Sequence, residues 1–178
     1  MKSFKQILIE KAKIAKRESK YIEFKESFDT DSTRDWCEII KDIVAIANSG
    51  GGIITFGAKN NGTPTDFDCS RILELDSATI TDKINRYTNT SFQDFEVEEI
   101  TRDKKKLASI IIEEIRIPMV FCKPGTYPIA DGKQKTAFSQ GTLYFRHGAK
   151  SEPCNSDDLK EIIERNLEQI KKSWLGNI

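Results

Sequence analysis

Two glutamates and a lysine lie close together near the start of the chain, in "ESKYIEFKES" at residues 18–27. Carboxylates such as Glu18 and Glu23 can hold a hard divalent cation, and an ammonium such as Lys25 can stabilise negative charge. The simpler alternative is that these side chains form salt bridges on the surface with one another or with neighbouring lysines. The segments around them must decide between the two readings.

The same stretch alternates apolar and polar residues, which predicts a β-strand. Ile22 and Phe24 should point to the core, while Glu23 and Lys25 should share the opposite, polar face. Residues 18 and 23 are separated by an odd number of positions and would face opposite sides of one strand. Glu18 therefore has to lie on a bend before the strand if the two carboxylates are to converge.

The charge of the chain is balanced overall but uneven locally. Its 178 residues contain 28 acidic and 28 basic side chains, yet residues 1–25 carry a surplus of positive charge. The four cysteines lie far apart and only one histidine is present, which argues against a zinc site rich in thiolate or histidine ligands. We find no apolar run long enough to span a membrane and expect a reduced, cytoplasmic protein.

The pattern of the remaining segments predicts one α/β (α+β) domain over residues 1–178, with a single mixed sheet flanked by helices. Amphipathic helices are expected at both ends, over 4–17 and from Asn155 or Ser156 to Trp174. Ser32 should cap a further helix that stops at "NSG". We expect strands at 53–56, in "FEVEEI" and in "LASIIIEEI", a helix at 78–87, and a long irregular segment at 118–141.

A compact basic turn is predicted near the end of the sheet, in "YFRHGAK". Arg146, His147 and Lys150 surround Gly148 there, and such a turn suits contacts with phosphate groups. Exposed loop charge without a ligand is the equally acceptable alternative.

Three stretches taken in order resemble the Schlafen AlbA-like domain family. They are "ESKYIEFKES", "DIVAIANSGGGIITFGAKNNG" and "GTLYFRHGAKSEPCNSDDL", which together span residues 18–159. Each is weak alone, but all three in order are specific. The resemblance implies an α/β domain that handles nucleic acid.

The resemblance also implies a site. In Schlafen RNases two glutamates and an aspartate bind a metal ion and a lysine assists, so Glu18 and Glu23 match the glutamates and Lys25 the lysine. The third metal ligand falls at Asn60, whose amide carries no negative charge, and binding of Mg²⁺ or Mn²⁺ should be weakened. Whether the chain is an enzyme stays open.

Our leading hypothesis is a protein that binds DNA or RNA through a basic face. The predicted contacts are Lys20, Lys25, Arg146, His147 and Lys150. One alternative is a metal-dependent endoribonuclease that acts on tRNA-like structured RNA, and another is a non-catalytic assembly subunit. The two-lobed arrangement of Schlafen nucleases and the apolar stripe ending at Trp174 further suggest a homodimer.

Overall fold

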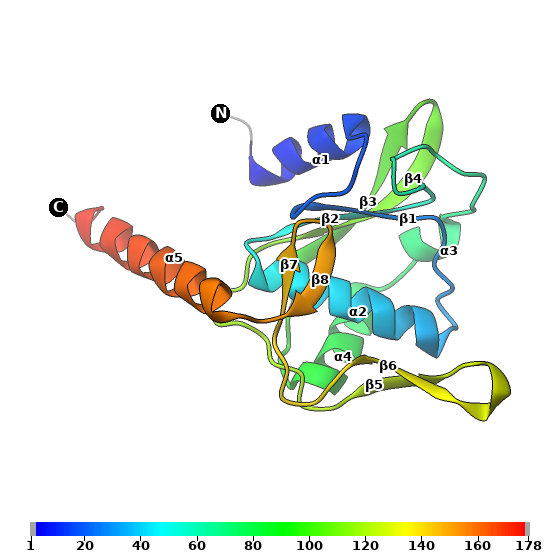
Figure 1. Cartoon of the computed structure of the whole chain (residues 1–178). Helices are drawn as coiled ribbons and strands as arrows, with labels where there is room; N and C mark the ends of the chain where they lie inside the picture. The colour runs from blue at the N-terminus through cyan, green and yellow to red at the C-terminus, as the bar shows by residue number, and fades with distance from the viewer. Residues whose placement is uncertain (1–2, 177–178) are drawn as a thin grey trace.

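The computed structural model describes residues 3–176 and is built around a four-stranded mixed sheet (Figure 1). The strand order is β1-β2-β4-β3. β1 and β2 run parallel, whereas β2 with β4 and β4 with β3 run antiparallel. The strands are β1 (Ile22–Lys25), β2 (Gly52–Phe56), β3 (Phe95–Arg102) and β4 (Lys105–Ile112). This mixed sheet with helices confirms the predicted fold class.

Helices cover both faces of the sheet, with α1 on one side and α2 on the other (Figure 1). Neighbouring residues of β2 pack on opposite faces of the sheet. Ile53 packs with Leu8 of α1, and Ile54 packs in the larger core with Ile40 of α2. The helices are α1 (Phe4–Ile14), α2 (Thr33–Asn48), α3 (Ser70–Leu73), α4 (Ser77–Thr88), α5 (Ser156–Leu175) and the 3₁₀ turn η1 (Ala130–Gly132).

α2 forms where the sequence predicts it. The Ser32 side chain accepts a hydrogen bond from the Asp35 amide at 3.2 Å, which caps the helix. The helix ends at Asn48, and Gly50 and Gly51 follow with φ of 101° and 87°. A Cβ on Gly51 would lie 2.8 Å from the Ile112 carbonyl oxygen, so glycine is needed for the tight connection into β2.

Two β-hairpins lie against α2, in regions for which the sequence predicts an irregular segment and a turn. The expectation of an irregular segment at 118–141 is wrong in part, because β5 (Gly125–Pro128) pairs with β6 (Gln134–Phe138). A second hairpin joins β7 (Tyr144–His147) to β8 (Lys150–Pro153). The strands of these hairpins bring aromatic residues such as Tyr127 and Phe138 into the core.

The buried Asn48 side chain ties these later segments to the end of α2. Its amide nitrogen donates to the Met119 carbonyl at 3.1 Å and to the Tyr144 carbonyl at 3.0 Å. Its carbonyl oxygen accepts from the Met119 amide at 2.8 Å. Three backbone groups from two segments thus depend on one side chain.

α5 leaves the body of the protein with most of its apolar side exposed (Figure 1). Its N-cap is Asn155, whose side chain accepts from the amides of Asp157 and Asp158. Ile162 is buried, but Ile163, Leu167 and Trp174 are 60%, 50% and 71% exposed. No helix within residues 3–176 is long and apolar enough to cross a bilayer.

Candidate functional site

The bend predicted before β1 is present and brings Glu18 back over the strand. A Glu18 carboxylate oxygen accepts a hydrogen bond from the Phe24 amide at 3.1 Å. Ile22 and Phe24 are buried toward α1, as predicted. Glu23 is buried as well, at 6% exposure, so the expected open polar face is wrong at this residue: Arg146 of the β7–β8 hairpin lies against its carboxylate, and Asp42 of α2 lies against the neighbouring Lys25.

Glu23 is part of a group of four charged residues that we call the ion cluster: Glu23, Lys25, Asp42 and Arg146. One Glu23 carboxylate oxygen lies 2.6 Å from the Lys25 ammonium, and the other lies 2.6 Å from the Arg146 guanidinium. Lys25 also contacts Asp42 of α2 at 2.7 Å. The second Asp42 oxygen accepts a hydrogen bond from the Ser151 hydroxyl at 2.6 Å.

Arg146 occupies the centre of this cluster, with its side chain only 1% exposed. Our prediction placed it in an exposed turn, which is wrong, because Arg146 belongs to β7, a strand in which both Phe145 and Arg146 are buried on opposite faces. It donates to the Ser19 carbonyl and to the Ser151 hydroxyl, both at 3.1 Å. Its Nε has no hydrogen-bond partner among the described residues.

Asp42 is the member of the cluster that sequence reasoning missed. A signal was present, since Asp42 lies three residues after Ile39 and four before Ile46, on the buried side of α2. An acidic residue at such a position needs a buried cation, because an unpaired charge there would be strongly unfavourable.

The cluster shifts the pKa values of two of the predicted site residues. Burial alone would lower the pKa of Lys25, but Asp42 and Glu23 outweigh burial and raise it above the usual lysine value. The pKa of Glu18 is raised, first by burial and then by the negative charge of Glu23. Lys25 is therefore a permanent cation at neutral pH.

The predicted metal set does not fit this arrangement. Both oxygens of Glu23 already contact cations, and Asn60 lies in the exposed turn after β2, where it makes no hydrogen bond to either glutamate within residues 3–176. No group of three or more histidine, cysteine or acidic residues in that range could hold a metal ion. Of the two glutamates, only Glu18 keeps a carboxylate oxygen without a hydrogen-bond or ion-pair partner among the described residues, and one such oxygen is too few to hold Mg²⁺ or Mn²⁺.

The other predicted contacts with nucleic acid are also largely paired. Lys20 forms an ion pair with Glu161 of α5 at 2.6 Å. Lys150 is exposed at the start of β8 and has no ion-pair partner in the part of the chain that the structure describes.

His147 connects the β7–β8 hairpin to α5. Its ring nitrogens lie 3.0 Å from Glu152 and 2.9 Å from Asp158. The hydrogen bond with Asp158 comes first among the causes that raise the pKa of His147 above its usual value, followed by that with Glu152. Asp158 also accepts from the Asn155 amide in the cap of α5.

We expect this contact to make stability depend on pH. A raised pKa means that charged His147 stabilises the fold fully below pH about 6.5, and that this contribution is lost as pH rises through the folded-state pKa. The midpoint of thermal unfolding should be higher for the parent than for His147→Gln at pH 6, and the difference should shrink toward pH 8.5. A difference that stays constant over this range would contradict the ionic role of His147.

A separate group of cations gathers where α1 ends, and we call it the basic end: Lys13, Lys16, Arg17, Lys59 and Lys104. All five are exposed, and none has an ion-pair partner within residues 3–176. Lys5, at the other end of α1, is by contrast paired with Glu96 and Glu98.

Arg102 brings the three segments of the basic end together. Its guanidinium donates at 2.6 Å to the carbonyl oxygens of Ala12 and Ala15, which closes the C-terminus of α1 against the end of β3. The turn after β2 packs in the same place, since a Cβ on Gly62 would lie 2.5 Å from the Ala15 oxygen. These contacts bring together the backbones of the three segments that carry the five cations.

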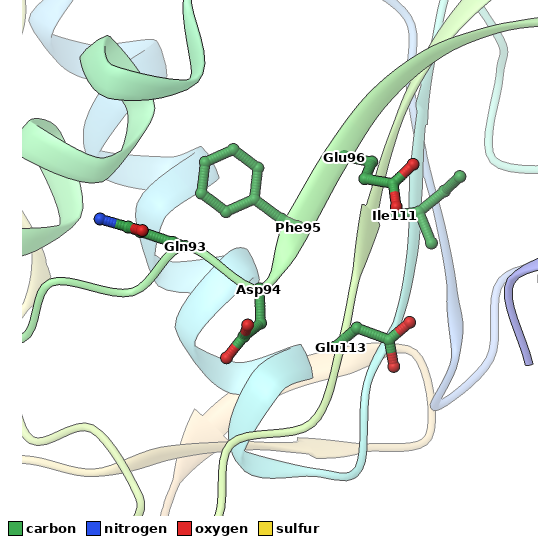
Figure 2. Close-up of a pocket in the computed structure, with 6 residues that line it drawn as sticks. All are labelled: Gln93, Asp94, Phe95, Glu96, Ile111 and Glu113. Atoms are coloured by element: carbon green, nitrogen blue, oxygen red, sulfur yellow. The ribbon is translucent and has the colours of Figure 1, made fainter.

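The opposite end of the β3–β4 hairpin is acidic. A pocket of about 220 Å³ lies there, and Figure 2 shows the carboxylates of Asp94, Glu96 and Glu113 around it, while the Phe95 ring turns away. Such a pocket repels phosphate groups. One hairpin therefore carries opposite charge at its two ends.

A comparison with protein families adds to this geometry. The model of the family described as "Schlafen, AlbA_2" matches residues 18–155. The chain belongs to the Schlafen AlbA_2 family. No curated protein matches the sequence.

Two solved structures are similar to this chain at low sequence identity. The crystal structure of the DIP2311 protein from Corynebacterium diphtheriae has a TM-score of 0.51 and 12% identity, and it aligns with 84% of this chain. This chain corresponds to 25% of that protein's length. The solution structure of the N-terminal domain of a putative ATP-dependent DNA helicase RecG-related protein from Nitrosomonas europaea has a TM-score of 0.43 and 17% identity. That alignment covers 87% of this chain and 95% of the helicase-related domain.

The Schlafen AlbA_2 match covers the ion cluster completely and the basic end only in part. Every member of the ion cluster lies inside the matched residues. Lys13, Lys16 and Arg17 lie before them, so the basic end combines residues within the family match with residues of α1 and the bend outside it.

Proposed function

We propose that this protein binds nucleic acid by contacting the phosphate backbone with its basic end. Membership of a nucleic-acid-associated family supports the general function. The observation that carries the proposal is that three segments meeting at the end of α1 carry five exposed cations, none with an ion-pair partner among the described residues, in a chain with no net charge. Unpaired lysine and arginine side chains can neutralise phosphates and release bound counterions.

The proposed surface differs from the one that the sequence suggested. Arg146 lies inside the protein, and Lys20 and His147 are paired with acidic residues. Lys150 is exposed and stays in the proposal as an additional contact. Contacts of this kind position a backbone and do not read base sequence, so we expect binding to both DNA and RNA.

Fluorescence anisotropy with labelled duplex DNA and duplex RNA tests the proposal. Affinity should fall steeply as salt rises from 50 to 200 mM, because each phosphate contact contributes about 0.9 to the slope of log K against log salt for duplex DNA. Absence of binding to either duplex at 50 mM salt would contradict the proposal and favour a role as an assembly subunit.

We also propose that α5 pairs with α5 of a second copy. Ile163, Leu167, Ile170 and Trp174 recur at the three- and four-residue spacing of a helix–helix interface, and Ile163, Leu167 and Trp174 are exposed. Glu164 and Lys171 flank them, and an antiparallel partner helix would bring Glu164 of each copy beside Lys171 of the other. Self-complementary charge of this kind fits a two-fold dimer.

Light scattering tests the dimer directly. At tens of micromolar the parent should have twice the mass of one chain, and Leu167→Asp should have the mass of one chain because it places a charge in the apolar contact. A parent that is monomeric at this concentration would remove the proposal.

A further inference from the structure

The ion cluster contains as many positive as negative charges, in a place that water hardly reaches. The side chains of Glu23, Asp42 and Arg146 are 7%, 6% and 1% exposed, and that of Lys25 is 27% exposed. Two carboxylates and two cations therefore balance, and each carboxylate lies within 2.7 Å of a cation. Buried charges are tolerated when they are paired in this way.

Each carboxylate oxygen of the cluster already has a partner. For Glu23 the partners are Lys25 and Arg146, and for Asp42 they are Lys25 and Ser151. A divalent cation needs such oxygens as ligands, and here it would also lie against two existing positive charges.

Arg146 in addition joins segments that are far apart in the sequence. Its guanidinium contacts Ser19 before β1, Glu23 in β1 and Ser151 in β8, and it lies 3.9 Å from Asp42 in α2. Its backbone amide donates to the Ser49 hydroxyl at 2.8 Å, at the end of α2.

We propose that the side chains of Arg146 and Lys25 neutralise the buried carboxylates of Glu23 and Asp42. They take the place that a metal ion would occupy beside these carboxylates. The ion cluster is then a metal-independent clamp that holds the β7–β8 hairpin against β1 and α2. This inference does not depend on nucleic-acid binding.

Thermal unfolding of variants in which a charged side chain is replaced by a neutral one tests the clamp. Arg146→Gln and Glu23→Gln should each lower the unfolding midpoint by about 10 °C, because each removes one ionic partner from a charge that stays buried. The double variant should unfold at a higher temperature than Arg146→Gln, since it removes both charges together. Arg71→Gln is the matched control, because Arg71 pairs with Asp31 on the surface and its loss should have little effect.

Two results would overturn the clamp. One is an Arg146→Gln midpoint within about 2 °C of the parent. The other is a double variant no more stable than Arg146→Gln. If Arg146→Gln yields no folded protein, the double variant with Glu23→Gln is the test. A folded double variant supports charge compensation between the two residues, and an unfolded one contradicts it.

A titration with Mn²⁺, followed by electron paramagnetic resonance of the free ion, tests metal independence. The parent should show no saturable site at submillimolar Mn²⁺. A stoichiometric site that disappears in Glu23→Gln would overturn the proposal. Binding that persists unchanged in Glu23→Gln arises elsewhere and supports it.

Discussion

Replacing Lys13, Lys16 and Arg17 together by alanine is expected to weaken binding to duplex DNA and RNA by about tenfold or more at moderate salt. The three side chains are exposed and unpaired in the described structure, so their loss removes positive charge without breaking an internal contact. The slope of log K against log salt should also fall by about 3, one for each lost phosphate contact. Anisotropy titrations at several salt concentrations measure both quantities.

A matched control variant distinguishes the loss of the basic end from the loss of positive charge in general. Lys133, Lys160 and Lys172 are exposed on the β5–β6 hairpin and α5, and their replacement by alanine removes the same charge elsewhere. This control should keep both the affinity and the salt slope of the parent. Equal losses in the two triple variants would show that the basic end is not the contact surface.

Asn48→Ala is expected to lower the free energy of unfolding by about 3 kcal/mol. Asn48 is fully buried, and its loss leaves the Met119 amide and the carbonyl oxygens of Met119 and Tyr144 without their partner. Unfolding in urea, with midpoint and slope both fitted, measures this change.

The control for Asn48 is Asn85→Ala, on the exposed side of α4. Its effect should stay within about 0.5 kcal/mol, as for most surface substitutions. A cost below about 1 kcal/mol for Asn48→Ala would mean that the segments at Met119 and Tyr144 are held mainly by apolar packing.

Local signals in the sequence predicted the elements that depend on local physics. The Ser32 cap, the apolar stripe of α2 and the glycines after Asn48 fix that helix almost to the residue. The boundary of α1 was less accurate, since the helix ends at Ile14 and not near Arg17. Arg102 closes α1 from 87 to 90 residues away, and no pattern within the helix carries that information.

The candidate site was predicted only in part, for the same reason. The bend at Glu18 follows from the odd separation of residues 18 and 23, which would place them on opposite faces of one strand, and the structure contains this bend. The partners of Glu23 come from residues 42 and 146, which meet it only after the sheet and the β7–β8 hairpin have formed. The sequence suggests that Arg146 is a turn residue because Gly148 follows closely, yet Arg146 lies in β7 and is buried against Glu23 and Ser19.

The opposite charges at the two ends of the β3–β4 hairpin have a consequence for how the protein orients in the field of a polyanion. The eight residues from Phe95 to Arg102 separate the ends by roughly 24 Å. A molecule without net charge feels little overall pull toward a polyanion, but this separation gives it a dipole moment, and the field of the polyanion exerts a torque on it. The protein should therefore rotate before contact, so that the C-terminal end of α1 and the turn after β2 arrive first and the Asp94 pocket faces away.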